Sequence, residues 1–168
     1  MEYRELYDEK RRPLGRAIAP GESVPEGAYL LTVGIWIVND QKQVLITRRS
    51  LEKRWAPGKW ENPSGHVQQG ETGEDAIIRE LREETGLIAS KENIHHLGTA
   101  RVWPYFGDNY VVRMNANLAD VRLQPGETCD VKWVTLAELD RMLQDGEMAA
   151  STLAHMAYYR ETFERWVK

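Results

Sequence analysis

The stretch GHVQQGETGEDAIIRELREETGL, residues 65–87, carries the clearest helix signal in the chain. Thr72 can cap a helix start because Asp75 follows three residues later, an aspartate variant of the capping box. Gly86 stands where a glycine commonly ends a helix. The pattern therefore predicts a helix from Thr72 to Thr85. The apolar stripe of this helix, which should face the core, consists of Ile77, Ile78 and Leu81.

Three glutamates of the same helix, Glu80, Glu83 and Glu84, fall within five positions. At about 100° per residue they cover an arc of roughly 100°, adjacent to the apolar stripe but distinct from it. Glu80 and Glu84 repel each other at this spacing. Such a face is either solvated or completed by a cation, and clustered carboxylate oxygens are the ligands that Mg²⁺ prefers. Arg79 lies four residues before Glu83 and can hold its orientation by pairing with it.

The stretch also has a specific spacing of fixed residues. It reads Gly65, five residues, Glu71, seven residues, Arg79-Glu80-Leu81, one residue, Glu83-Glu84, one residue, Gly86-Leu87. This pattern resembles the Nudix box, and every fixed position is filled. Since glycine and glutamate each make up about 7% of ordinary sequences, such a match arises by chance roughly once in 10⁸ starting points. The resemblance therefore outweighs a merely solvated acidic helix.

The resemblance to Nudix enzymes implies an α/β fold, namely an α/β/α sandwich with a mixed sheet. It also implies hydrolysis of a nucleoside diphosphate linked to another group, by attack of metal-activated water on phosphorus, with Mg²⁺ or Mn²⁺ as cofactor. The implied metal ligands are Glu80, Glu83, Glu84 and the backbone carbonyl of Gly65. The implied catalytic residues are Glu71, which supports the water shell, Arg79, Glu83, Glu84 and Glu127. Glu127 is the candidate base from a later loop, with Asp130 as second candidate and an ordinary polar turn as the alternative.

A rival activity lies within the same fold. The segment RRSLEKRWAPGKWENPSGH, residues 48–66, resembles isopentenyl diphosphate isomerase. Those isomerases place a catalytic cysteine just before the Gly-His pair, where this chain has Ser64, and they bind metal largely through histidines, of which only His66 persists. A serine hydroxyl cannot replace a thiol as a proton donor of suitable pKa. The intact glutamate box favours the hydrolase, and a catalytically inactive ligand-binding module is a second alternative.

Substrate-binding candidates flank the box on both sides. Cationic side chains precede Gly65 in a loop and can attract an anionic substrate to a negative protein. These candidates are Arg48, Arg49, Lys53 and Arg54. Trp103 and Tyr105 follow the box and can stack on a base, although a core role for Trp103 is equally open. The substrate itself is not defined by these residues.

The remaining sequence predicts one α/β domain over residues 29–168, preceded by an N-terminal arm or hairpin over residues 1–28 that is rich in proline and glycine. Strands are predicted at 29–38, 44–49, 94–103, 109–118 and 131–134. Helices are predicted at 136–143, capped by Thr135, and at 149–166. The last helix should face inward with Leu153, Met156, Tyr159, Phe163 and Trp166.

Composition excludes several classes of protein. The formal net charge of −4 argues against binding nucleic acid by bulk electrostatics. The longest apolar run, residues 28–38, is too short to span a bilayer, and the charged N-terminus does not resemble a signal peptide. A single cysteine, Cys129, cannot form an internal disulfide, so a cytoplasmic protein is expected. We expect a small diphosphate as partner, without nucleic acid or membrane, and leave a homodimer open.

Overall fold

A mixed seven-stranded sheet organises the protein, whose computed structural model describes residues 2–168. The strands run in the order β5-β4-β3-β8-β7, with β6 paired to β3 and β9 paired to β4. Only β3 and β8 are parallel, and the other pairs are antiparallel. The strands are β3 (Leu30–Val38), β4 (Gln43–Arg49), β5 (Trp60–Glu61), β6 (Ser64–His66), β7 (Ile94–Val102), β8 (Tyr105–Arg113) and β9 (Thr128–Thr135).

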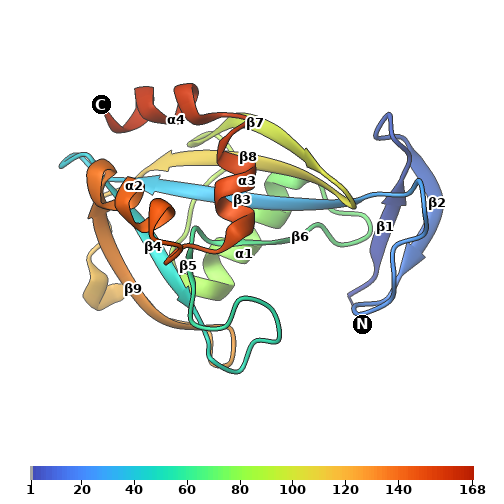
Figure 1. The fold of residues 1–168 in the computed structure, drawn as a ribbon, viewed down its shortest axis with the longest axis horizontal. Coiled ribbons are helices and arrows are strands. Elements are labelled where there is room, and N and C mark those ends of the chain that lie inside the picture. The colour runs from blue at the N-terminus through green and yellow to red at the C-terminus, as the bar shows by residue number, and fades with distance from the viewer. Residues whose placement is uncertain (1) are drawn as a thin grey trace.

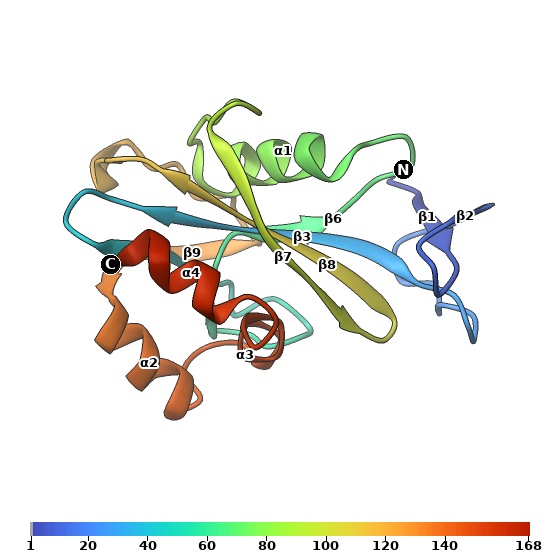
Figure 2. The same cartoon turned by 90° about the horizontal axis from the view of Figure 1, so that it is seen from above.

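Helices cover both faces of this sheet (Figures 1 and 2). One face carries α1 (Gly73–Thr85), and the other carries α2 (Leu136–Gln144), α3 (Ala150–Met156) and α4 (Arg160–Val167). A short 3₁₀ helix, η1 (Leu118–Asp120), precedes β9. The predicted α/β fold with a mixed sheet is confirmed. Within residues 2–168, no helix is long and apolar enough to cross a membrane.

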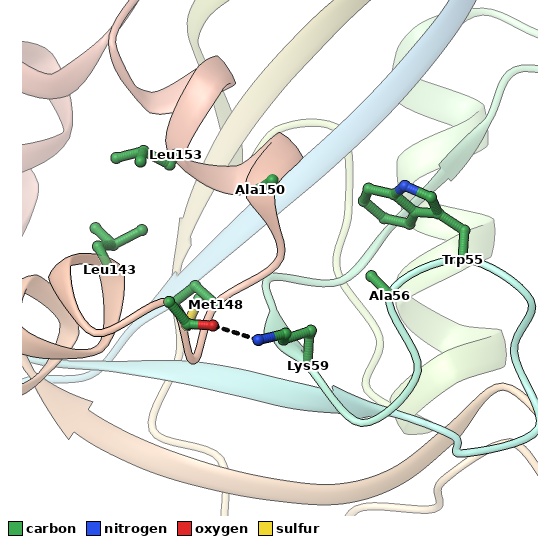
Figure 3. A pocket seen from close by; sticks show the side chains of 8 residues that line it. Trp55, Ala56, Lys59, Leu143, Met148, Ala150 and Leu153 are labelled. Atoms are coloured by element: carbon green, nitrogen blue, oxygen red, sulfur yellow. Dashed lines mark hydrogen bonds between the residues drawn. The ribbon is translucent and has the colours of Figure 1, made fainter.

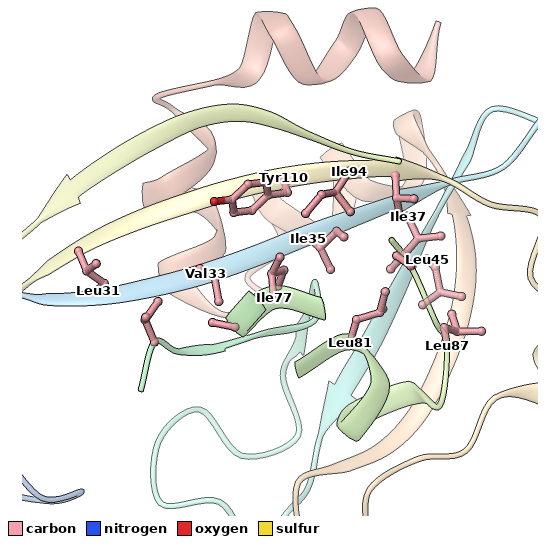
Figure 4. Close-up of a cluster of buried hydrophobic side chains, with 14 of the residues drawn as sticks. Leu31, Val33, Ile35, Ile37, Leu45, Ile77, Leu81, Leu87, Ile94 and Tyr110 are labelled. Carbon is pink, nitrogen blue, oxygen red and sulfur yellow. The ribbon is translucent and has the colours of Figure 1, made fainter. Parts of the chain in front are cut away.

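The core between α1 and the sheet fixes the helix that bears the glutamates (Figure 4). Ile77 and Leu81 are fully buried there against Val33, Ile35 and Leu45. The helix ends are the ones predicted, because the Thr72 side chain accepts from the backbone N–H of Asp75 and Gly86 adopts a left-handed conformation with φ 73°. Local capping and the apolar stripe together determine where α1 begins, ends and faces.

The opposite core is organised around Trp36, which is fully buried. Its indole N–H donates to the hydroxyl of Tyr159 at 3.0 Å, and that hydroxyl donates to Asn109 Oδ1 at 3.1 Å. The rings of Trp36 and Phe163 lie 4.8 Å apart. Because β3 is covered on both faces, its apolar residues are continuous rather than alternating.

A two-stranded hairpin, β1 (Arg4–Tyr7) and β2 (Pro13–Ile18), lies at one end of the sheet (Figure 1). Leu6 is buried with Ala28 and Leu30. Tyr7 and Tyr29 exchange backbone hydrogen bonds of 2.9 and 2.8 Å. The Arg11 guanidinium at the hairpin turn forms an ion pair with the buried Asp108 of β8. The hairpin is therefore attached to the domain by apolar, backbone and ionic contacts.

Three sequence predictions were wrong in their boundaries. The short strand predicted at 131–134 is the longer β9 (Thr128–Thr135). The strand predicted at 109–118 is β8, which already starts at Tyr105 directly after a turn and ends at Arg113. The helix predicted at 149–166 is two helices, because Tyr159 leaves helical geometry to place its hydroxyl between Trp36 and Asn109. Met156, Tyr159 and Phe163 are buried as predicted and Trp166 is partly buried, but Leu153 is 54% exposed.

Leu81→Ala should lower the free energy of unfolding by about 2–5 kcal/mol, because it leaves a cavity between α1 and the sheet. The matched control is Ile88→Ala, whose side chain is 76% exposed just beyond the helix and should cost no more than about 0.5 kcal/mol. Chemical denaturation monitored by tryptophan fluorescence measures both. Equal losses in the two variants would mean that α1 does not pack as described.

Candidate active site

Arg79 is the centre of the polar cluster on α1. Its Nε and Nη2 donate to the two carboxylate oxygens of Glu71 at 2.7 and 2.9 Å. Its Nη1 donates to Glu80 at 2.8 Å and, more weakly, to Glu83 at 3.3 Å. Nη2 also donates to the carbonyl of His66 at 3.0 Å. The predicted Arg79–Glu83 pair is present, but the stronger contacts are those with Glu71 and Glu80.

The carboxylates around Arg79 have different environments. The hydrogen bonds from Arg79 lower the pKa of Glu71, which also accepts from the backbone N–H of Gln68 at 3.0 Å. Burial raises the pKa of Glu80 despite its contact with Arg79. Glu71 is therefore a fixed anion, whereas Glu80 retains a desolvated charge that a cation can stabilise.

Glu84 lies apart from the arginine, in the protein interior. Only 7% of the residue is exposed, and its Oε2 has no hydrogen-bond partner among residues 2–168. Burial raises its pKa well above the usual value, and the nearby charges of Glu61 and Glu80 raise it further. The three glutamates thus do not form one solvated face. Glu84 is a buried acid whose burial is only partly compensated, by a hydrogen bond from the backbone of Ser64.

Glu61 is a neighbour of Glu84 that the sequence analysis missed. It lies on β5, is only 4% exposed, and accepts from Arg49 Nη1 at 2.9 Å. Burial raises its pKa, and the charge and hydrogen bond of Arg49 oppose that shift. Glu61 lies outside residues 65–87, so the spacing of fixed residues in that stretch did not point to it. Only the pairing of β5 with β4, opposite Thr47, brings this carboxylate to the site.

Gly65 leaves space for the Glu80 carboxylate. A Cβ at position 65 would lie 2.1–2.6 Å from the Glu80 carboxyl atoms, so no other residue fits without displacing Glu80. Within the described chain, no three His, Cys, Asp or Glu side chains are arranged to hold a metal ion, and Arg79 binds both Glu80 and Glu83. The donor set nevertheless fits a hard divalent cation, since the unpartnered Glu84 oxygen and the desolvated Glu80 supply oxygen ligands beside Gly65.

The predicted substrate-binding cations are mostly engaged within the protein. Arg48 donates to the carbonyl of Gly58 at 2.9 Å, and Arg49 donates to Glu61 and to the carbonyl of Trp55. Lys53 forms an ion pair with Glu127, the predicted base. Arg54 is exposed. The structure therefore brings Lys53 and Glu127 together at the edge of the site, whereas Arg48 and Arg49 hold the loop after β4.

The aromatic candidates differ in position. Trp103 is 58% exposed, which removes the core role, whereas Tyr105 is partly buried and its ring lies 5.8 Å from that of His66. Burial, with the charges of Arg4 and Lys53, lowers the pKa of His66 to about 4, so its imidazole is neutral at pH 7. His66 Nε2 is buried and lacks a partner within residues 2–168.

An apolar pocket of about 340 Å³ lies between the loop after β4 and the α2–α3 segment (Figure 3). Its wall includes Trp55 on one side and Leu143 and Leu153 on the other, and Lys59 Nζ donates to the carbonyl of Gly146 at 2.5 Å. None of the site carboxylates lines it. Arg49, which binds both the Trp55 carbonyl and Glu61, is the residue between the pocket and the carboxylates.

The sandwich and its carboxylate-bearing helix define the Nudix class of domain. The family model for the NUDIX domain matches residues 28–155, and the chain belongs to this family. The chain is accordingly an enzyme of the pyrophosphate-bond hydrolase type. Nudix enzymes generally use divalent metals and act on small-molecule substrates.

Three relatives illustrate the similarity. An uncharacterised Nudix hydrolase of Listeria monocytogenes is 31% identical over 153 residues, 88% of each chain. An isopentenyl-diphosphate Delta-isomerase of Klebsiella pneumoniae is 35% identical over 140 residues, 80% of this chain and 76% of the other. The crystal structure of a Deinococcus radiodurans protein matches with a TM-score of 0.78 at 25% identity, covering 99% of this chain and 100% of the other.

Glu84→Gln should raise the melting temperature in EDTA at pH 8, because it replaces a buried carboxylate that faces Glu61 and Glu80 by a neutral amide. An uncompensated buried polar group costs about 1–3 kcal/mol, and 1 kcal/mol corresponds to about 2–4 °C in a chain of this size. Since the pKa of Glu84 is raised on folding, wild-type stability falls as the pH rises through the folded value. The advantage of the variant should therefore be smaller at pH 5.

Glu83→Gln is the matched control, because its side chain is 38% exposed and contacts Arg79 at 3.3 Å. It should melt close to the wild type in EDTA. Differential scanning fluorimetry with and without Mn²⁺ completes the test, and Glu84→Gln should lose most of the stabilisation by Mn²⁺. A Glu84→Gln variant that melts below wild type in EDTA would contradict the incomplete compensation of its burial.

Proposed function

We propose that the protein is a Mg²⁺- or Mn²⁺-dependent hydrolase that cleaves the diphosphate bond of a nucleoside diphosphate linked to another group. The observation that carries this proposal is the buried, unpartnered carboxylate of Glu84 beside Glu61 and Glu80. A protein retains such a costly arrangement where a ligand compensates it. A divalent cation held by these carboxylates would supply the missing charge and would bind a diphosphate.

The residues of the box have distinct roles in this proposal. Arg79 holds Glu71 and the His66 carbonyl in place, and so positions the loop that carries Gly65 against Glu80. Glu80, Glu84 and the Gly65 carbonyl are the proposed metal ligands, with Glu83 joining them when it leaves its weak contact with Arg79. Bound Mg²⁺ supplies Lewis acidity towards the diphosphate oxygens and the attacking water.

The candidates for the base that accepts the water proton are Glu127 and Asp130. Glu127 lies close enough to Glu84 for its charge to act on that residue. Although Glu127 pairs with Lys53, 43% of the Glu127 side chain is exposed. We assign Glu127 as the base, with Lys53 moving to the substrate when Glu127 turns towards water.

A cytoplasmic location and a homodimer stay predictions.

Glu80→Gln should lower kcat/KM for diphosphate hydrolysis by about 100-fold or more, since even residues that only support metal ligands contribute about 10–100-fold. A panel of nucleoside diphosphate conjugates, such as ADP-ribose and dinucleoside polyphosphates, with Mg²⁺ or Mn²⁺ provides the assay. In ¹⁸O-water, one label should enter a single phosphoryl product, because water oxygen forms the new P–O bond while the bridging P–O bond breaks.

Glu74→Gln is the control for this variant, because Glu74 is exposed on the same helix and its substitution removes the same charge. It should hydrolyse the substrate at the wild-type rate. Label on a sugar carbon, or a trapped phosphoenzyme, would contradict attack of water on phosphorus. Wild-type protein that releases no product from the whole panel with either metal would leave the inactive binding module as the better description.

An isomerase is the second candidate, favoured by the similarity to proteins named isopentenyl-diphosphate Delta-isomerase. Ser64 precedes Gly65 and His66 on β6, where that reaction needs a thiol. The chain's only cysteine, Cys129, is exposed on β9 and donates to the carbonyl of Arg49 at 3.5 Å. It therefore does not substitute for a thiol at position 64.

Wild-type protein should not convert isopentenyl diphosphate to dimethylallyl diphosphate, and Ser64→Cys alone should not create that activity, because the histidine ligands of the isomerases are also missing. Product analysis by gas chromatography after phosphatase treatment measures the conversion. Isomerisation by the unaltered protein would overturn the choice of hydrolase.

A further inference from the structure

The N-terminal hairpin contacts the loop of the active site directly. The backbone N–H of Gln69, in the loop between β6 and α1, donates to the carbonyl of Tyr3 at 2.8 Å. Figure 2 shows the start of β1 beside this loop. Burial is the main cause that raises the pKa of Glu80, and Arg79 opposes it. The negative charge of Glu2 raises this pKa further. The first residues of the hairpin are therefore neighbours of the carboxylate cluster.

Arg4 lies on the face of the hairpin that is turned towards the domain. Residues paired directly across two strands point to the same side of a hairpin, and for Arg4 this is the side of the cluster formed by Leu6, Ala28 and Leu30. Its cross-strand partner is Ile18, which packs against the same cluster. The side chain of Arg4 is accordingly directed inward, and the residue is partly buried.

Tyr105 connects this face of the hairpin with the active site. It packs against the cluster around Leu6, and its ring lies 5.8 Å from that of His66. His66 is next to Gly65 on β6. Arg4 and Lys53 are the two cations whose charges act on His66. The inward face of the hairpin is thus one wall around His66.

Arg4 has no ion pair or side-chain hydrogen bond with any other described residue. Five acids of the site are engaged elsewhere, since Glu71, Glu80 and Glu83 bind Arg79, Glu61 binds Arg49, and Glu127 binds Lys53. The sixth, Glu84, is buried with a raised pKa and forms no ion pair with Arg4. The guanidinium of this partly buried arginine has unused planar donors, which suit the oxygens of phosphate. The available partner is an anion that enters from solvent.

We propose that Arg4 is a substrate-binding residue, contributed by the N-terminal hairpin, that binds a phosphate group of the diphosphate on the side opposite the α1 carboxylates. This inference rests on the proposed function and deepens it. The carboxylates hold the substrate through a cation, and Arg4 holds it through direct charge-assisted hydrogen bonds. The hairpin is then a part of the active site.

The test compares Arg4→Gln with Arg16→Gln, which removes the same charge from an exposed position on β2 of the same hairpin. Arg4→Gln should raise KM and weaken binding of α,β-methylene-ADP with Mg²⁺ by about 10- to 100-fold, the usual effect of one charge-assisted hydrogen bond. The value of kcat should change much less, and Arg4→Lys should restore part of the loss. Arg16→Gln should behave as wild type.

Two readouts separate binding from structure. Melting temperatures in EDTA and stabilisation by Mn²⁺ alone should be the same in Arg4→Gln and wild type, because Arg4 forms no ion pair or side-chain hydrogen bond within residues 2–168 and glutamine keeps the inner part of its side chain. Equal affinities of Arg4→Gln and wild type, equal losses in both glutamine variants, or a loss that follows a lower melting temperature would overturn the inference while leaving the hydrolase intact. Wild-type protein that neither hydrolyses the panel nor binds α,β-methylene-ADP would overturn both proposals.

Discussion

The bidentate pair of Arg79 with Glu71 is the interaction on which the active site depends. It connects the helix to the loop that leaves β6, and the same guanidinium binds the His66 carbonyl, Glu80 and Glu83. A single cation thus neutralises part of a cluster that would otherwise be repelled by its own charge. The contact is partly buried, where charge-assisted hydrogen bonds are stronger than in water. Its geometry requires α1 at a fixed height above the sheet, and this height is set by Ile77 and Leu81 in the core.

Glu84 and Glu61 show the opposite situation, because their burial is not fully compensated. Arg49 binds Glu61, but Oε2 of Glu84 has no partner in the described chain. In a protein without a ligand such a group lowers stability, whereas a bound cation would convert the same carboxylates into ligands. Stability and activity therefore make different demands at this position. The well-capped helix and the two covered faces of the sheet supply the stability that tolerates the cost.

The sequence predicted the parts of the protein whose causes are local. The caps and stripe of α1 lie within residues 72–86, and the mixed α/β fold follows from the box and its flanks. It failed where the cause is distant. The break before α4 depends on Tyr159 meeting Trp36, which is 123 residues away, and Glu61 reaches Glu84 only through strand pairing. The ion pair of Arg49 with Glu61 depends on the same strand pairing and was not predicted.

Local and distant causes of structure apply to different groups of residues in the candidate site. The carboxylates proposed to bind a metal are carried by α1, whose structure its own sequence determines. The proposed substrate-binding residues come from elements far apart in the chain: the hairpin with Arg4, the loop with Lys53, and the start of β8 with Tyr105. A change in any of these elements alters the surroundings of His66 without touching the Arg79 contacts. Proteins with the same box can therefore differ in substrate, or in reaction where the residue before Gly65 also changes, and the box alone predicts the class of chemistry but not the substrate.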